Sequence, residues 1–567
     1  MFTFLFFDKL VIVKKEDNMK KNSFLEGTFI ATLAIFITKI MGMLYVIPFY
    51  SIIGKNGSAL YSYAYNIYLI FLSISSAGIP IAISKIVSEY AAKDCEEAKV
   101  RSFKIGLIIT SILSIICFLI LILFPEQIAH LIVGDLEGGN SIKDIKLVII
   151  AVAFSVLIIP FLSVSKGYLQ GHKYIKPTSV SQMIEQFVRI LVIILGSYIV
   201  IRILKLDIPY GVGVAVLGSF IGGIVAIVYI LNVIRKNKSK LSLEKSLDKD
   251  NVKDKDIFKK IVSYAIPFVF INLTVNIYNT VDMSLILRTL SKLGFSGMES
   301  EFVASAITTW GYKLNQIVSA FATGVITSLI PNLVTYYTLK DYNKTNEIIN
   351  KSMQIILFVS IPAAFGLSFL AKPVWTLFYG ASNLGPTIFS FSILTSILCN
   401  MYIILVQAAQ SMNMYKTVYF AVFSGFFTNA LLDVPLMKLF NLLNLPPYWG
   451  ASFSTMLGFT ISLAIILIRF KKIKEIKYRD TVIMSGKILF STIIMIILLK
   501  LLNIFIPFNN LTRMKSLVLI ILYSLVGIIS YLFMTHEFKI IQLLFGDKLS
   551  KILEKFRAKK KKVKNGN

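Results

Sequence analysis

Cysteine and histidine are scarce in this sequence, with three of each among 567 residues. The cysteines Cys95, Cys117 and Cys399 are widely separated and form no CxxC motif. Their spacing therefore indicates neither a disulfide framework nor a cysteine-ligated metal. The histidines are also far apart and show no spacing typical of metal ligands; they are His130, His172 and His536. We expect no cofactor and no metal site.

Acidic residues are few beside the basic ones. The chain has 30 Asp and Glu against 59 Lys and Arg, which gives a formal net charge of +29. The basic residues cluster at the ends of apolar segments, a placement typical of topology signals and of contacts with anionic membrane lipids. We therefore expect anionic lipids as partners at the basic loops and tail, and no nucleic acid.

Motifs for nucleotide binding and catalysis are lacking. The glycine-rich stretch GSFIGG at 218–223 follows no predicted strand and precedes no Walker lysine, so it indicates helix packing rather than phosphate binding. No nucleophile, base and orienting residue stand in a recognisable arrangement. The sequence therefore predicts a protein that is not an enzyme.

Long apolar runs dominate the chain. Hydrophobic residues make up 56% of it, against roughly 45–50% in soluble proteins, and the mean hydropathy is +0.75. The apolar segments, about 20 residues each, are too long and too unbroken for barrel strands. The sequence predicts an all-α polytopic membrane protein with about 14 transmembrane helices.

The predicted hydrophobic segments divide the chain into blocks. The segments lie at 25–53, 60–90, 102–124, 145–166, 178–204, 210–234, 258–289, 301–337, 347–370, 386–410, 416–442, 448–470, 484–506 and 514–534. Residues 1–24 are interpreted as an N-terminal cytoplasmic extension, because no small-residue cleavage site supports the alternative of a signal peptide. The two main blocks are 25–234 and 258–470, with six segments each. A basic linker at 235–257 separates them, and the last two segments within 471–535 and a basic tail at 536–567 follow.

Positive charge alternates between successive loops. Lysine and arginine crowd the even-numbered loops, for example RFKKIKEIKYR at 469–479, whereas odd-numbered loops such as YGASNLGP at 379–386 are poor in positive charge. The positive-inside rule places lysine-rich loops in the cytoplasm. We therefore expect a multi-pass protein of the cell membrane with both termini cytoplasmic.

An internal repeat predicts two lobes. Residues 83–94 match 330–341 at an offset of 247, and 170–176 match 410–416 at an offset of 240. The lobes would be 25–234 and 258–470, each with six helices. Because six is even, the two copies would have the same orientation in the membrane.

One stretch carries charge deep into an apolar run. In YLQGHKYIKPTSVSQMIEQFVR at 168–189, Pro177 suits the first turn of a helix. Glu185 and Arg189 then lie about 12 and 18 Å along the axis, within the hydrocarbon layer. Their i, i+4 spacing predicts an ion pair. The pair would either line a transport cavity or pin neighbouring helices.

Further polar side chains fall within the predicted segments. Lys39 lies in the middle of the first segment, and Lys313 lies in the eighth beside Asn315 and Gln316. These four are candidates for lining a cavity, although a lysine can also reach the membrane surface by snorkelling. Acidic candidates within later segments are Asp282 and Asp433, the latter on the same run as Asn429.

Three stretches together resemble a known transporter family. They are SAGIPIAISKIVSEY at 76–90, KGYLQGHKYIKPTSVSQMIEQFVRI at 166–190 and WGYKLNQIVSAFATGVITSLIPNL at 310–333. With the segment count and the repeat, they are similar to the polysaccharide transporter branch of the multidrug/oligosaccharidyl-lipid/polysaccharide exporter superfamily. The resemblance is strongest to its stage V sporulation protein B-like and lipid II flippase members.

The resemblance implies a fold and a site. The fold would be two six-helix lobes in a V around a central cavity that opens alternately to each side, plus two C-terminal helices. Cationic residues in that cavity would hold the substrate pyrophosphate. Lys39 and Lys313 stand where family members have arginine. Tyr45 and Val46 stand where a second Arg–Asp pair is expected.

The leading hypothesis is thus a flippase for lipid-linked cell-wall precursors, which would be coupled to the membrane potential or an ion gradient. Its cavity candidates are Lys39, Lys313, Arg189, Glu185, Gln316, Asn315 and Asp282. The alternative within the same superfamily is a cation-coupled antiporter of drugs or organic cations, whose cavity should be dominated by acidic residues. A membrane scaffold without transport is a third possibility.

Overall fold

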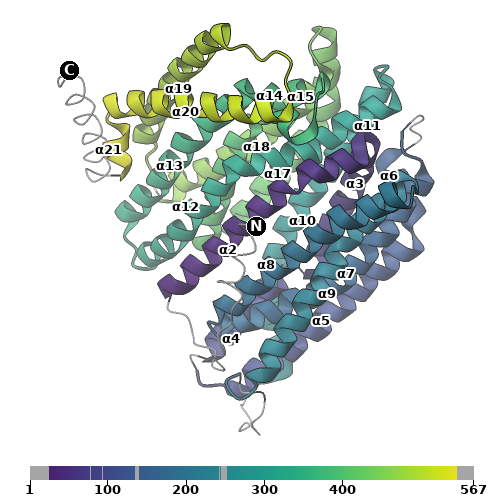
Figure 1. Cartoon of the computed structure of the whole chain (residues 1–567). Coiled ribbons are helices and arrows are strands. Elements are labelled where there is room, and N and C mark those ends of the chain that lie inside the picture. The colour runs from purple at the N-terminus through teal and green to yellow at the C-terminus, as the bar shows by residue number, and fades with distance from the viewer. Residues whose placement is uncertain are drawn as a thin grey trace, which may run out of the picture.

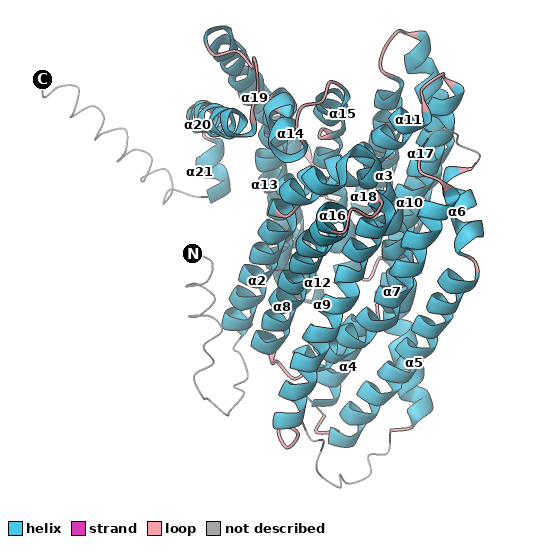
Figure 2. Cartoon of the chain, turned by 45° about the vertical axis from the view of Figure 1, so that its right-hand side comes forward, coloured by secondary structure: helices cyan, strands magenta, loops and turns pink. Residues whose placement is uncertain are grey.

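The computed structural model describes residues 24–545 apart from 77, 92, 135–138, 242, 244–251 and 475. Within these residues every regular element is a helix and there is no strand (Figure 2). The predicted N-terminal extension, apart from Phe24, lies outside the described residues, as do the greater part of the basic tail and the middle of the basic linker. The predicted all-α fold is confirmed.

The helices form two successive halves and a C-terminal pair. The N-terminal half comprises α2 (Phe24–Leu44), α3 (Val46–Ser76), α4 (Ile79–Ala91), α5 (Glu96–Leu123), α6 (Pro125–Val133), α7 (Ile142–Gly171), α8 (Ile175–Leu191) with π-helical turns at Val192–Gly196 and Ile199–Ile203, and α9 (Ile208–Lys236). The C-terminal half comprises α10 (Asp254–Lys292), α11 (Gly297–Ser305), a π-helical turn at Ala306–Gly311, α12 (Tyr312–Thr338), α13 (Tyr342–Phe369), α14 (Ala371–Tyr379), α15 (Leu384–Ser392), α16 (Thr395–Ser411), α17 (Tyr415–Leu442) and α18 (Pro447–Lys474). The C-terminal pair is α19 (Arg479–Phe505) and α20 (Arg513–Glu537), and the short α21 (Ile540–Phe545) follows it.

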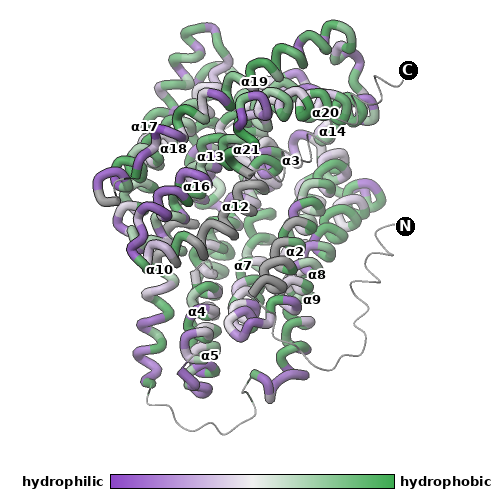
Figure 3. The backbone as a smooth tube through the Cα atoms, turned by 90° about the vertical axis from the view of Figure 1, so that its left-hand side faces the viewer, coloured by the Kyte–Doolittle hydropathy of each residue, from purple (hydrophilic) through white to green (hydrophobic). Residues whose placement is uncertain are grey.

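Membrane-spanning character is clear from length and composition. Within the described residues, eleven helical stretches are long and apolar enough to cross a bilayer. Hydrophobic residues run along most of the helices, and hydrophilic ones gather near the ends of α5 and α10 (Figure 3). The first two predicted segments meet at Gly54, where a positive φ of 67° kinks α3. The chain is a multi-pass membrane protein, and the count of fourteen spans stays a prediction.

Several helices connect the halves, α10 and α2 among them. Helix α10 packs against α3, α4 and α5 of the N-terminal half and also against α11 and α17 of its own half. Helix α2 contacts α8 on one side and α12 on the other, and lies between them (Figure 1). The C-terminal pair packs on the outside of the C-terminal half, with α19 against α13 and α20 against α14.

Equivalent turns recur at the repeat positions. Lys173 and Asn413, which the sequence match pairs, have φ values of 66° and 57°. In both turns the same backbone bonds form: Lys173 N–H to Gln170 O and Asn413 N–H to Gln410 O, each 2.9 Å. At the other repeat the turns are equivalent at Asp94 and Lys340, with φ values of 55° and 59°. These two turn residues are 246 positions apart, whereas the sequence match has an offset of 247. The structural equivalence after α4 is therefore shifted by one residue from the sequence match.

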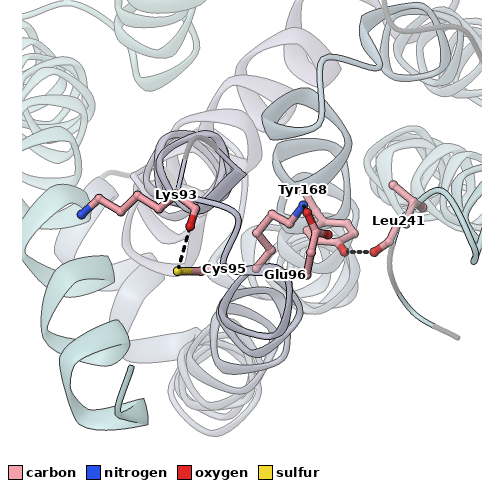
Figure 4. Close-up of polar contacts among 6 residues, drawn as sticks. Lys93, Cys95, Glu96, Tyr168 and Leu241 are labelled. Carbon is pink, nitrogen blue, oxygen red and sulfur yellow. Dashed lines mark hydrogen bonds and ion pairs between the residues drawn. The ribbon is translucent and has the colours of Figure 1, made fainter. Parts of the chain in front are cut away.

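The end of α7 holds the segment that follows α9. Tyr168 donates a hydrogen bond of 2.9 Å from its hydroxyl to the carbonyl of Leu241, which is fully buried (Figure 4). Phe103 stacks on the Tyr168 ring, with ring centroids 4.3 Å apart. Gly167 and Gly171 let α7 pack closely on α4, because a Cβ at either position would come within 2.8 Å of the backbone or side chains of α4. This packing holds Leu241, within the predicted basic linker, against α7.

The alternation of lysine-rich and lysine-poor ends yields a topology prediction. In a variant without the native cysteines, a cysteine at the exposed Asn509 should react with a membrane-impermeant maleimide in intact cells, because it lies at the lysine-poor end. A cysteine at the exposed Lys477 should react only after permeabilisation. Gly138 and Lys245, equally suited by sequence, lie outside the described residues. Labelling of Lys477→Cys in intact cells would reverse the orientation.

Candidate functional site

Lys313 lies at the contact between the halves, at the start of α12. The preceding π-helical turn, Ala306–Gly311, widens the helix and ends on Gly311. A Cβ at Gly311 would lie 2.6 Å from the carbonyl oxygen of Ala306, so glycine permits this turn. Such turns are frequent at functional sites. This one places Trp310 and Lys313 toward the N-terminal half.

An aromatic cage surrounds the Lys313 ammonium. We define the cage as Tyr45, Tyr61, Tyr65 and Trp310, whose ring centroids lie 5.1, 4.9, 5.6 and 4.4 Å from Nζ. All four distances fall within the range of cation–π attraction. Lys313 Nζ also donates a 2.9 Å hydrogen bond to the Tyr45 hydroxyl. The three tyrosines belong to the N-terminal half, so this contact joins the halves.

Further contacts hold the cage rings in place. The Trp310 indole donates to the carbonyl of Ser58 at 3.1 Å, and the Trp310 carbonyl accepts from the Tyr379 hydroxyl at 2.7 Å. Tyr61 and Tyr65 stack one helical turn apart, with centroids 6.1 Å apart. The hydroxyls of Tyr45 and Tyr61 are 3.3 Å apart. Because its rings are fixed by other contacts, the cage is preorganised for a cation.

Arg189 lies near Lys313, but its partner differs from the prediction. The predicted Glu185–Arg189 ion pair is wrong: Arg189 donates to the side-chain carbonyl of Gln186, while Glu185 accepts from Lys166 Nζ at 2.7 Å. Lys166 lies on α7, which packs beside α8, so a neighbouring helix supplies a nearer cation than the same helix does. Arg189 remains close enough to Lys313 for their charges to repel.

The other predicted cationic residue, Lys39, lies on α2 and is partly buried. One turn later on the same face, a Cβ at Gly42 would lie 3.2 Å from the Gln186 side-chain nitrogen, so α2 and α8 are in close contact here. Along α2, Lys39 is therefore one helical turn from the point of contact with Gln186, on the α8 segment that also carries Arg189.

Asp282 and Asp433 form a buried acidic site within the C-terminal half. Asp282 on α10 accepts a hydrogen bond from Asn429, and Asp433 accepts one from Ser454 on α18. Asp433 is fully buried, and its Oδ2 has no partner among the described residues. The Ser454 hydroxyl also lies 2.9 Å from Asn429 Oδ1, so Asn429 and Ser454 bring the two carboxyl groups into one polar cluster. Two carboxylates this close cannot both stay ionised in a dry interior unless a proton or a cation balances them.

A cavity of about 100 Å³ adjoins this acidic site. Its wall includes Asp282 and Thr455, and also Tyr312 and Asn315, the chain neighbours of Lys313. Two wall atoms, the Tyr278 hydroxyl and Asn315 Oδ1, have no protein partner among the described residues. A cavity of this size has room for several water molecules, which would satisfy such atoms. The predicted candidates Asn315 and Asp282 therefore line one cavity, while Gln316 follows on α12.

Glu301 makes a second contact between the halves, at the lysine-poor end. Its Oε1 accepts from the Tyr63 hydroxyl at 3.0 Å and from the Asn140 backbone N–H at 2.8 Å, and its Oε2 accepts from the Asn140 side chain at 2.7 Å. Glu301 is 1% exposed and lies in the middle of α11, whereas its donors come from α3 and the loop before α7. Nearby, Arg288 of α10 donates to the carbonyl of Leu131 at 2.9 Å. These bonds hold the two halves together at this end.

Sequence reasoning missed the cage and Glu301. The cage had a usable signal, since Tyr61 and Tyr65 in YSYAY are spaced i, i+4 and share a helix face within a membrane segment. Glu301 gave no signal, because it stands at a segment end where an acidic residue is ordinary.

The family model described as "Polysaccharide biosynthesis protein" matches residues 24–337. The chain is 30% identical to a protein of Bacillus subtilis (strain 168) named "Lipid II flippase MurJ", over 94% of this chain and 98% of the relative. It is also 24% identical to "Stage V sporulation protein B" of the same organism, over 64% of this chain and 68% of the relative. These matches confirm the resemblance drawn from the three sequence stretches.

Solved structures share the fold. A structure titled "Lipid II flippase MurJ, inward closed conformation" superposes with a TM-score of 0.65 at 18% identity, covering 90% of this chain and 99% of that one. An inward-facing multidrug resistance MATE family transporter of the MOP superfamily superposes with a TM-score of 0.61 at 13% identity, covering 78% and 99%. The chain therefore belongs to the polysaccharide biosynthesis protein family, and its fold is that of the MOP superfamily transporters.

Proposed function

We propose that this protein is a flippase for lipid-linked cell-wall precursors, lipid II or related undecaprenyl-pyrophosphate-linked saccharides, and that it works by alternating access in the cytoplasmic membrane. One observation carries the proposal. Lys313 lies where the two halves meet, in the cage and near enough to Arg189 for their charges to repel, and among the described residues neither cation has an Asp or Glu oxygen within 4.0 Å, although Glu185 still attracts Arg189 from farther away. The relative at 30% identity is a lipid II flippase, which supports the same substrate class.

The two cations give the site its affinity for an anion. A charge inside a membrane protein is costly and normally marks a substrate or ion pathway. Lys313 can bind a phosphate as a point charge, and Arg189 adds a planar guanidinium suited to two oxygens. Both attractions are stronger in a partly dry site than in water. Lys39, one turn from the α8 contact, would extend the same positive region.

The cage ties anion binding to movement of the halves. While Lys313 stays in the cage, it contributes contacts that join α12 to α2 and α3. A pyrophosphate that draws the ammonium away removes those contacts and so favours a different arrangement of the halves. A ligand can shift a conformational equilibrium only by such a difference in affinity. Glu301 would open and close the lysine-poor end in the same cycle.

The buried acidic site suits a coupling ion. Its ligand atoms would be carboxylate, amide and hydroxyl oxygens from Asp282, Asp433, Asn429 and Ser454, which a proton or a hard cation can use. No three His, Cys, Asp or Glu side chains gather as metal ligands in the part of the chain that the structure describes. An ion gradient acting at this site would reset the transporter without ATP.

Export of organic cations is the second candidate function. The MATE-like fold is compatible with it. The charges at the contact between the halves argue against it, since Lys313 and Arg189 would repel a cationic drug. The acidic residues Asp282 and Asp433 are instead enclosed by α10, α17 and α18 of one half, where a small ion fits better than a drug.

Substrate charge recognition leads to a prediction for Lys313. Lys313→Gln should lower precursor export about tenfold to a hundredfold, the loss expected for one charge-assisted bond. Lys313→Arg should keep part of the activity, and Lys313→Glu should abolish export while membrane abundance stays normal. The measurement is precursor translocation and protein level for each variant. Lys340→Glu, at the exposed turn after α12, is the matched control and should behave like the wild type.

Two results would contradict this role. Normal export by Lys313→Glu would remove the lysine from the mechanism and reopen the organic-cation alternative. Loss of abundance in Lys313→Glu, with normal export per molecule in Lys313→Gln, would make the lysine structural.

Ion coupling leads to a separate prediction. Asp282→Asn and Asp433→Asn each preserve side-chain shape but remove one of two adjacent charges. In proteoliposomes, transport driven by an imposed sodium or proton gradient should fall at least tenfold, whereas affinity for the pyrophosphate headgroup should change less than about threefold, because the cations that bind it remain. Asp256→Asn, at the exposed start of α10, is the control. Gradient-driven transport that survives in both variants would exclude this acidic site as the coupling centre.

A further inference from the structure

A groove of about 620 Å³ lies where the C-terminal pair meets the C-terminal half, at the lysine-rich end. It runs between α13, the start of α19 and α21, and we name it the interface groove. Three lysines line it: Lys351, Lys477 and Lys487. The mechanism above uses none of them, and the groove belongs to neither the cage nor the acidic site.

The interface groove has a net charge of +1, from three lysines against two acidic residues. Glu347 and Asp480 also line the groove, yet among the described residues no lysine of the groove has a carboxylate oxygen within 4.0 Å. The lining charges therefore leave a net positive charge. This arrangement is what a site for an anionic group requires.

Hydrogen bonds between α13 and the start of α19 build the polar side of the groove. Thr481 of α19 donates to the side-chain oxygen of Asn350 on α13 at 2.6 Å and accepts from Gln354 at 3.2 Å. The Asn350 amide donates in turn to the carbonyl of Lys477 at 2.9 Å. The first turn of α19 has no side-chain cap, because the N-cap residue, Tyr478, supplies no hydrogen bond to it. An uncapped helix N-terminus beside lysines favours a phosphate.

The opposite wall of the groove is apolar and open. Ile483 and Leu543 are 50% and 63% exposed, and Met484 and Ile540 lie behind them. Exposed apolar side chains next to lysines at the end of membrane helices fit the boundary between lipid headgroups and acyl chains. A soluble phosphate compound would leave this wall in contact with water.

We propose that the interface groove binds an anionic membrane phospholipid, whose phosphate lies on the three lysines and whose acyl chains lie along α19 and α21. The bound lipid fills the space between the C-terminal pair and α13, so it holds α19 in position against the transporter. The site differs from the substrate site, since the cage and the groove share no residue.

Lipid retention tests this proposal on the purified full-length protein. The protein is equilibrated with micelles that contain equal amounts of phosphatidylglycerol and phosphatidylcholine, and bound lipid is counted by native mass spectrometry. The wild type should retain phosphatidylglycerol preferentially. Replacing Lys351, Lys477 and Lys487 together by Gln should lower this retention at least tenfold, since each lysine near a membrane surface is worth about fivefold.

Two variants make the result specific to the groove. Gln at Lys340, Lys471 and Lys472 removes three exposed lysines from the same end without touching the groove, and should leave retention within twofold. Glu347→Gln with Asp480→Asn removes the acidic lining and should raise retention. Equal loss in both lysine triples, or no loss in the groove triple, would overturn the site.

A competition arm identifies the ligand source. Glycerol phosphate, which has the headgroup charge without acyl chains, should not displace phosphatidylglycerol at millimolar concentration. A polyprenyl pyrophosphate should not displace it either at equimolar amounts. Displacement by glycerol phosphate would make this a site for soluble phosphates, and displacement by the polyprenyl compound would make it part of the substrate path; either result overturns the proposal. None of these outcomes depends on whether Lys313 binds substrate.

Discussion

The cost of burying charge in a membrane interior governs this structure. The protein meets that cost in three ways: Glu185 is matched by Lys166, the carboxyl groups of Asp282 and Asp433 share one polar cluster, and Lys313 is held by aromatic rings. The first solution cancels charge locally. The second demands a proton or a cation. The third leaves the positive charge uncancelled, since rings attract a cation without bringing a formal charge of their own.

A neutral cage leaves the Lys313 ammonium available to an anion, which an ion pair would not do. A carboxylate beside Lys313 would repel an arriving phosphate, and the phosphate would have to displace it at a high desolvation cost. The tyrosine rings hold the ammonium in place and still allow its field to reach an anion. Because these rings belong to the other half of the molecule, the resting position of one side chain is also a contact between the halves.

How much could be read from the sequence depended on the range of the interaction involved. Composition and charge alternation predicted an all-helical membrane protein, and the positions of Lys313, Arg189 and Asp282 within apolar segments marked them as charges inside the membrane. The partner of Glu185 was mistaken because the i, i+4 rule sees a single helix, whereas the α7–α8 packing brings Lys166 closer. The cage also depends on long-range packing, since Tyr45 and Trp310 are 265 positions apart in the chain. The π-helical turn that directs Trp310 into the cage has no reliable sequence signature.

The position of α12 explains how the substrate and ion sites could influence each other. Lys313 faces the N-terminal half, while its neighbours Tyr312 and Asn315 line the cavity that reaches Asp282. Any displacement of this helical turn changes both environments at once. If anion binding shifts the turn and alters cation affinity, cation binding must alter anion affinity by the same factor, because the two equilibria share one cycle. One helical turn that contacts both sites is therefore sufficient for coupling, without a relay of charged residues between them.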